Sequence, residues 1–138
     1  MSIEASLTAD GIGVVYTSMG LLTGQDLLDA GEHFRVQVRS NPETRYLIMD
    51  HSAIPEEKVD IVSLKALASR VSKILEPTSE VLMAIVAPND ALFGLSRMWE
   101  ALAEQTGFIT RAMRTRTETT AWLEEELQQR QLPFQLTE

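Results

Sequence analysis

The stretch Val81-Leu-Met-Ala-Ile-Val-Ala-Pro-Asn-Asp90-Ala-Leu-Phe-Gly-Leu-Ser-Arg-Met-Trp99 decides the fold class of this sequence. Residues 81–87 form an unbroken apolar run, too short for a helix of its own and typical of a central strand covered on both faces. Pro88 ends the strand, and Asn89 and Asp90 can each offer a side-chain oxygen to the free amides of a first helical turn. The stretch therefore predicts one strand-helix half of a layered α/β domain. The apolar residues at helical spacing in that helix are Ala91, Leu95, Met98 and Leu102.

The N-terminal residues predict a β-hairpin that leads into a helix. Apolar and polar residues alternate over residues 3–8, which is typical of an edge strand with one wet face. Asp10-Gly11 is a tight-turn signal, and residues 12–17 form the second strand. Thr23 can cap a helix that stops by Asn41-Pro42. The apolar stripe of this helix consists of Leu27, Ala30, Gly31, Phe34 and Val38.

Residues 46–49 predict the third strand, with Asp50-His51-Ser52 at its carboxyl end and a connecting loop over residues 53–58. Asp60 is the expected cap of a second helix, and Glu76-Pro77 terminates that helix. The apolar residues of this helix show the clearest helical period in the chain: Ile61, Leu64, Leu67, Ala68, Val71, Ile74 and Leu75.

The C-terminal part predicts the end of the third helix, a last strand and a last helix. Gly107 is the expected left-handed C-cap, and residues 108–113 form the strand. Thr115 with Glu118 is a capping-box pattern. The chain from about residue 128 onward is expected to be a loosely attached tail. The apolar residues of the last helix are Trp122, Leu123 and Leu127.

The order of these segments predicts an α/β fold. We expect a single layered domain over residues 1–138, with an N-terminal hairpin followed by alternating helices and strands. Strands that are separated by helices require crossover connections, so the five-stranded sheet should be mixed but mostly parallel.

Composition narrows the classes of partner. The net charge of −8 makes nonspecific attraction to nucleic acids or anionic membranes unfavourable. The sequence has no cysteine and begins without an apolar signal segment, which favours a cytosolic location and excludes thiolate metal sites. No apolar run approaches the roughly 18 residues of a spanning helix. The two histidines, His33 and His51, are far apart in the sequence, so we expect no metal site and no cofactor.

Asp50, His51 and Ser52 place an acid, an imidazole and a hydroxyl at the carboxyl end of a strand, where open α/β sheets hold their ligands. Neighbouring residues on a strand point to alternate sides, which argues against a catalytic triad. We therefore expect Asp50 to cap its loop and His51 to be partly exposed, with a ligand role open to both.

Asn89, Asp90, Gly94 and Arg97 could form a small anion or ligand pocket at a helix N-terminus. Asp90 argues against an anion, because its carboxylate already complements the helix dipole. Capping is therefore the favoured role of Asn89 and Asp90, and Gly94 is expected to be a close-packing position.

Three arginines lie on or just after the last strand: Arg111, Arg114 and Arg116. Such a patch could bind an acidic partner or a phosphate, but pairing with Glu118 and the acidic run 124–126 is the favoured interpretation. Trp99 and Trp122 are expected to be core residues, and His33 a surface residue.

Four segments resemble, in their order and spacing, the SpoIIAA-like branch of the STAS domains, the fold of bacterial anti-sigma-factor antagonists. They are Gly-Leu-Leu-Thr-Gly-Gln-Asp at 20–26, Tyr-Leu-Ile-Met-Asp at 46–50, Val-Leu-Met-Ala-Ile-Val at 81–86 and Thr-Arg-Thr-Glu-Thr-Thr-Ala-Trp-Leu at 115–123. The likeness spans nearly the whole chain and implies a protein-binding module.

One segment departs from that family. In its signalling members, the helix after the third strand opens with Asp-Ser-Ser-Gly, and a partner kinase phosphorylates the first serine. The corresponding residues here are Asp60, Ile61, Val62 and Ser63, so an isoleucine replaces the phosphoacceptor and the glycine is absent. The resemblance therefore implies partner binding around Asp60, Ile61 and Ser63, without the usual switch, and Ser63 is a weak substitute.

The sequence as a whole favours a non-enzymatic, cytosolic, STAS-like module that binds a protein partner or self-associates as a dimer. The alternative is a domain that binds a small apolar ligand or lipid, because the CRAL-TRIO lipid carriers resemble this layout. A hydrolase that uses Asp50, His51 and Ser52 would require those side chains to lie within hydrogen-bond reach.

Overall fold

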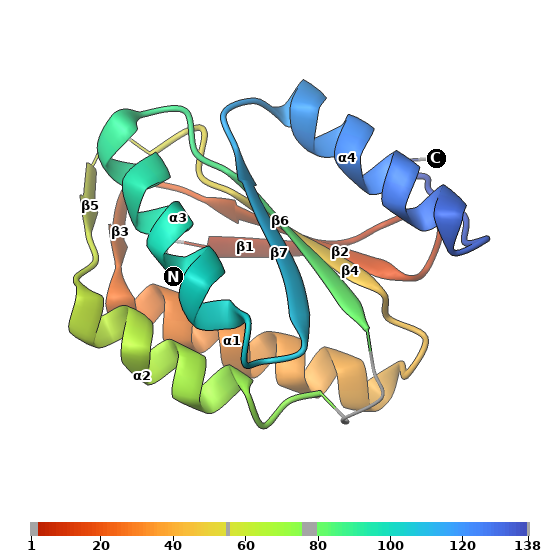
Figure 1. Ribbon diagram of the computed structural model, residues 1–138, viewed down its shortest axis with the longest axis horizontal. Coiled ribbons are helices and arrows are strands. Elements are labelled where there is room, and N and C mark those ends of the chain that lie inside the picture. The colour runs from red at the N-terminus through yellow and green to blue at the C-terminus, as the bar shows by residue number, and fades with distance from the viewer. Residues whose placement is uncertain (1–2, 55, 76–79, 138) are drawn as a thin grey trace.

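A computed structural model describes residues 3–54, 56–75 and 80–137 of the chain (Figure 1). Helices and strands alternate along most of it. The elements are β1 (Ile3–Leu7), β2 (Gly13–Ser18), β3 (Leu21–Thr23), α1 (Gly24–Ser40), β4 (Tyr46–Asp50), β5 (Glu56–Lys58), α2 (Ile61–Val71), β6 (Val81–Val86), α3 (Asp90–Ala103), β7 (Phe108–Met113) and α4 (Arg116–Gln129).

The main sheet has five strands in the order β1-β2-β4-β6-β7. β1 pairs with β2 in antiparallel fashion, and the other three pairings are parallel. All six residues of β6 are buried, as expected for a central strand with cover on both faces. The predicted α/β class and the mixed, mostly parallel, five-stranded sheet are confirmed.

Two separate apolar clusters cover the two faces of this sheet. Alternate residues of each strand point to opposite faces, so Leu47 and Met49 join one cluster while Tyr46 and Ile48 join the other. Helices α1, α2 and α3 pack on the first face. Helix α4 packs on the opposite face, and Figure 1 shows the strands lying between α4 and the α1–α2 pair.

Local capping accounts for where the four helices begin. The side chains of Thr23, Asp60, Asn89 and Thr115 each accept a hydrogen bond from the backbone N–H three residues later. All four caps were predicted from the sequence, because a capping motif depends only on residues within one turn.

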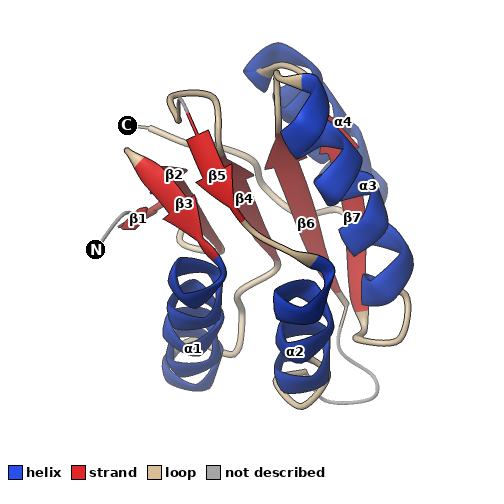
Figure 2. Ribbon diagram, turned by 90° about the vertical axis from the view of Figure 1, so that its left-hand side faces the viewer, coloured by secondary structure: helices blue, strands red, loops and turns tan. Residues whose placement is uncertain are grey.

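The connecting loop predicted over residues 53–58 is wrong in part. Residues 56–58 form β5, which pairs with β3 in a two-stranded parallel sheet beside the main one (Figure 2). These three-residue strands are too short to show an alternating pattern. β3 runs directly into α1, and two residues separate β5 from α2. The ribbon that they form is a tertiary feature, because its two strands are more than thirty positions apart in sequence.

The apolar stripe predicted for α3 is rotated by one residue. Ala91 and Met98 are exposed, and the side of α3 that faces the sheet carries a different set. Both sets have helical spacing, and the large indole of Trp99 buries more apolar area than Met98 could. The buried residues of α3 are Leu92, Ser96, Trp99 and Ala103.

Two helix ends also differ from prediction. Helix α3 ends at Ala103, and Gly107, at φ +88°, lies in the turn that follows. Helix α2 ends at Val71, while Ile74 and Leu75 pack against the core from the turn beyond it. The predicted stop at residues 76–77 lies outside the described residues.

The loosely attached tail predicted from about residue 128 is wrong: helix α4 continues to Gln129, and Leu132, Phe134 and Leu136 pack, partly buried, against the apolar cluster beneath α4. The ring of Phe134 meets Tyr46 edge-on at 5.6 Å between centroids. The backbone N–H of Gln135 donates to Asp10 Oδ2 at 2.8 Å, and the Tyr46 hydroxyl donates to the same oxygen at 2.6 Å. The tail is therefore fixed by apolar contacts and by a carboxylate at the other end of the sequence.

Candidate functional site

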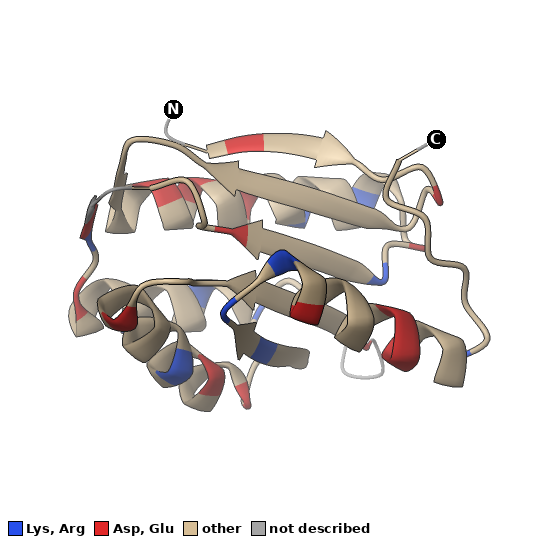
Figure 3. Ribbon diagram, turned by 90° about the horizontal axis from the view of Figure 1, so that it is seen from above, with Lys and Arg blue, Asp and Glu red and all other residues tan. Residues whose placement is uncertain are grey.

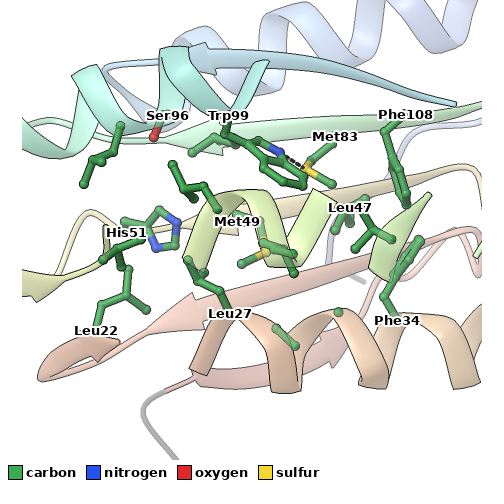
Figure 4. A pocket seen from close by; sticks show the side chains of 18 of the residues that line it. Leu22, Leu27, Phe34, Leu47, Met49, His51, Met83, Ser96, Trp99 and Phe108 are labelled. Carbon is green, nitrogen blue, oxygen red and sulfur yellow. Dashed lines mark hydrogen bonds between the residues drawn. The ribbon is translucent and has the colours of Figure 1, made fainter. Parts of the chain in front are cut away.

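A cavity of about 80 Å³ lies between the sheet and the three helices that cover its first face (Figure 4). Leu47, Met49, Met83 and Ile85 line it from the central strands. Figure 4 shows His51 at one end of the lining and Phe34 and Phe108 at the other, so the hollow is elongated. The residues that line it from the helices and their flanking segments are Leu22, Leu27, Ala30, Gly31, Val59, Leu64, Leu67, Val71, Ile74, Leu92, Leu95, Ser96 and Trp99.

His51 is the polar group at the end of this cavity, and the prediction that it is partly exposed is wrong. The residue is only 5% exposed, and its Nδ1 lies 2.7 Å from the hydroxyl oxygen of Ser18 on β2. Burial lowers the pKa of His51 to about 4, although the nearby Asp50 carboxylate acts in the opposite direction. The imidazole is therefore neutral at pH 7.

Asp50 belongs to a different set of contacts. Its Oδ1 accepts hydrogen bonds from the backbone N–H and the hydroxyl of Ser52 at 2.9 and 2.5 Å, which is the loop-capping role predicted for it. Its Oδ2 pairs with Arg116 at 2.6 Å. Burial of Asp50 opposes ionisation, but the bonds from Ser52 and the Arg116 guanidinium outweigh it and lower the pKa of this carboxyl.

Asp50, His51 and Ser52 do not form a catalytic triad. Ser52 hydrogen-bonds to Asp50, whereas His51 turns to Ser18, and the described residues show no hydrogen bond between His51 and Ser52. This separation follows from the alternation of side chains at the end of a strand.

The ligand residues predicted at the start of α3 are occupied by structural contacts. Asn89 Oδ1 accepts from Leu92 N at 2.8 Å, and Asp90 pairs with Arg114 at 2.8 Å. Arg97 pairs with Glu100 at 3.0 Å. These residues do not meet Asp50 or His51 in a common set of contacts.

Gly94 is not the close-packing position that was predicted. A Cβ atom placed on Gly94 would meet nothing within 4 Å. The glycine lies on the exposed side of α3, which follows from the one-residue rotation of the buried stripe.

The arginines near the end of β7 pair with other acids than those predicted. Figure 3 marks where basic and acidic residues lie along the ribbon. Arg114 pairs with Asp90, donates to Pro88 O at 3.0 Å and lies 4.1 Å from the Phe93 ring centroid. Arg116 pairs with Asp50. Arg111 lines a polar groove of about 400 Å³ over α3 and β7, together with Arg97 and Glu118. The partners lie across the strand ends, which sequence proximity did not reveal.

The predictions for the two tryptophans and for His33 can be compared directly with the structure. Trp99 is 5% exposed, and its Nε1 donates to Met83 Sδ at 3.2 Å, so its core role is confirmed. Trp122 is partly buried against the cluster beneath α4. His33 is exposed on α1, as predicted, and its Nδ1 lies 2.8 Å from the Tyr16 hydroxyl.

The first turn of α2 is built from the segment that the family resemblance singles out. Asp60 Oδ1 accepts from Ser63 N at 2.8 Å, which fixes the start of the helix and lowers the pKa of Asp60. The Ser63 side chain packs on α1: a Cβ placed on Gly24 would lie 2.4 Å from Ser63 Oγ. Ile61 and Val62 are instead exposed, by 38% and 71%.

Two more exposed apolar residues lie at the same end of the molecule. Met19, just before β3, and Leu21, its first residue, are each 39% exposed. Residues 21–23 pair with 56–58, just before α2, and a Cβ placed on Gly24 would meet Ser63, so the ribbon leads directly into the starts of α1 and α2. We call Met19, Leu21, Ile61 and Val62 the ribbon-end patch.

A solved structure of another protein shares this architecture. It is an uncharacterized protein of the DUF3478 family from Shewanella loihica PV-4, described as having a SpoIIAA-like fold. The match covers 88% of this chain and 91% of that one, with a TM-score of 0.54 and 13% sequence identity. This chain has a SpoIIAA-like fold. No family model and no curated protein sequence matches it.

Among the described residues there is no candidate metal site and no candidate membrane-spanning helix. No group of three His, Cys, Asp or Glu side chains there is placed to hold a metal ion. None of the described helices has the length and apolarity that crossing a bilayer requires.

Sequence reasoning missed several features of the SpoIIAA-like domain. The Ser18–His51 contact joins residues 33 positions apart, and the Asp50–Arg116 pair joins residues 66 positions apart. No local motif marks either one. The apolar Ile61 and Val62, in a first helical turn where neither is buried, were the signal that could have indicated the ribbon-end patch.

Proposed function

We propose that this protein is a non-enzymatic, cytosolic docking module that binds a protein partner through the ribbon-end patch. The exposure of Val62 and Ile61 at the start of α2 carries the proposal, because apolar side chains grouped at one end of a domain are typical of interaction surfaces. The resemblance to the antagonist branch of the STAS domains implies partner binding around Asp60, Ile61 and Ser63, in the same first turn of α2.

The energetic argument rests on Val62. Its side chain is 71% exposed, and burying a valine fully contributes roughly 1.5–3 kcal/mol. The residue lies in the first turn of α2, which Asp60 caps and so defines well, and little ordering of the surface is therefore required on binding.

The charge around the patch favours a partner over a second copy. The ribbon and helix starts that carry the patch also carry three acidic residues, Asp26, Glu57 and Asp60, and one basic residue, Lys58, and the whole chain has a net charge of −8. Like charges would repel each other across a contact between two copies. We therefore infer a partner with an apolar centre and a basic rim.

The proposed docking does not use the family's phosphorylation switch. Ile61 has no hydroxyl, and the Ser63 side chain is packed against Gly24. A phosphate on Ser63 would need the contact between α1 and α2 to open, so regulation at this site would have to act through the partner.

The test compares two single substitutions of exposed valines. Val62→Glu places a charge in the patch, and Val36→Glu places the same charge on α1, where the wild-type valine is 51% exposed. Each variant and the wild type serve as bait in extracts of the cells that make the protein, and candidate partners are then purified and titrated by calorimetry. The proposal expects a purified partner that wild type and Val36→Glu bind equally and that Val62→Glu binds at least about tenfold more weakly, the loss of 1.4 kcal/mol or more.

Two outcomes contradict this proposal. In one, every purified partner binds Val62→Glu as tightly as wild type. In the other, light scattering shows a wild-type dimer that Val62→Glu, but not Val36→Glu, converts to a monomer, which assigns the patch to self-association.

A further inference from the structure

The cavity beneath α1, α2 and α3 has an almost wholly apolar lining that contains few polar side chains. None of its lining residues is Asp, Glu, Lys or Arg. The Ser96 hydroxyl donates to Leu92 O at 2.8 Å, and Trp99 Nε1 is engaged by Met83. The remaining polar lining group is the imidazole of His51.

His51 has one ring nitrogen engaged and one available. Nδ1 lies 2.7 Å from Ser18 Oγ, and the described residues form no hydrogen bond to Nε2. Nε2 is not among the fully buried side-chain atoms that lack a partner in the described residues, so it borders open space and is accessible to a hydrogen-bonding group in the hollow that His51 lines.

The size of the cavity limits what can enter. Its volume of about 80 Å³ is several times the roughly 10–15 Å³ that one water needs, and about half that of an engineered 150 Å³ cavity that binds benzene or xenon. The apolar lining disfavours a chain of waters, because each water needs two or more polar partners. A molecule of a few heavy atoms fits without rearrangement.

We propose that this cavity is a binding site for a small, uncharged, mostly apolar molecule whose hydroxyl group pairs with Nε2 of His51. The apolar part lies toward Phe34 and Phe108, along the long direction of the hollow (Figure 4). A hydroxyl both donates and accepts, so it pairs with Nε2 whichever tautomer the Ser18 contact imposes. The class is therefore a small apolar alcohol.

The charge of the ligand follows from the same residues. Burial lowers the pKa of His51 to about 4, so the ring is neutral at pH 7 and offers no counter-charge. A carboxylate or ammonium group would lose its hydration with no ion to replace it, which costs far more than a hydroxyl does. Anionic and cationic ligands are disfavoured for this reason.

The experiment uses two probes, 1-butanol and xenon, with methyl- and imidazole-labelled protein followed by NMR. Both probes should shift the methyl resonances of Leu67 and Val71 in a saturable manner, because both side chains line the cavity. Only 1-butanol should also shift the ¹⁵N resonance of His51 Nε2. This measurement needs no substitution and therefore does not depend on the stability of a variant.

Three variants sharpen the result. Ala30→Leu fills the hollow and should abolish binding of both probes, whereas Ala101→Leu, at an exposed position of α3, should leave both unchanged. His51→Leu should weaken 1-butanol about fivefold, the value of one hydrogen bond near 1 kcal/mol, and leave xenon within about twofold.

The proposal is overturned if neither probe shifts the cavity methyls saturably. It is also overturned if 1-butanol binds there while His51 Nε2 stays unmoved, since the hydroxyl would then have no role. Both results are independent of Val62, so the docking proposal stands or fails separately.

Discussion

The two faces of the main sheet are covered differently. Helices α1, α2 and α3 cover one face and leave an elongated cavity of about 80 Å³ that ends at a neutral, buried His51. One helix and the C-terminal tail cover the other, where Leu123 and Leu127 are fully buried and Phe134 packs on Tyr46. The two faces therefore differ in cover: three helices leave a hollow on one, and one helix with the C-terminal segment packs on the other.

Truncating one leucine on each face should give the largest change in the free energy of unfolding, and the size of the loss should differ between the two faces. Leu123→Ala on the closed face should lower the free energy of unfolding by about 4 kcal/mol, because its fully buried side chain loses all its contacts. Leu67→Ala on the cavity face should cost about 2–3 kcal/mol, because that side chain already borders empty space. Urea unfolding of both variants measures the difference, and equal losses would contradict the comparison.

Acid should weaken the cavity face first. The pKa of His51 is about 4 in the folded state against an ordinary 6.5, so the unfolded chain binds more protons between these values. Stability should therefore be fully present above about pH 6.5 and fall as the pH drops to 4, by on the order of 3 kcal/mol. The lowered pKa of Asp50 acts only at still lower pH.

Urea unfolding across this pH range tests the acid prediction, with an NMR titration of the His51 ring as a direct check. His51→Leu should flatten the loss between pH 6.5 and 4. An unchanged slope in that variant would assign the acid sensitivity to other groups.

Replacing one alanine on each face by leucine should give a smaller difference in stability between the two faces. Ala84→Leu, at the centre of β6 and facing α4, should destabilise by about 2–3 kcal/mol, since overpacking forces side chains off their rotamers. Ala30→Leu extends into the cavity and should change stability by less than about 1 kcal/mol. Thermal unfolding distinguishes them, and a large loss for Ala30→Leu would mean that the hollow cannot accept added atoms.

The C-terminal tail should contribute less to the free energy of unfolding than the features above. Phe134→Ala removes an edge-on contact with Tyr46 and part of the apolar cover, at a cost of about 1–2 kcal/mol. Gln135→Ala keeps the backbone bond to Asp10 and should stay within about 0.5 kcal/mol of wild type. If the two variants unfold at the same urea concentration as wild type, the tail does not stabilise the closed face.

Much of the fold could be predicted because its signals are local. The apolar run ending in Val86 marks a buried strand, and the caps at Thr23, Asp60, Asn89 and Thr115 act within three residues. The candidate site could be predicted less well. Asp50 was placed correctly as a loop cap, since its partner Ser52 is two residues away, whereas the burial of His51 depends on Ser18 and on helices from three parts of the chain.

The sequence by itself determined the five strands of the main sheet, the helix starts and the α/β class, because alternation, helical period and capping are set by residues close together in the chain. The tertiary structure alone decided which of two helical stripes α3 buries, that Arg116 pairs with Asp50, and that the tail closes one face while the other stays hollow. These features join residues far apart in sequence, and the packing of whole elements selects among alternatives that are locally equivalent.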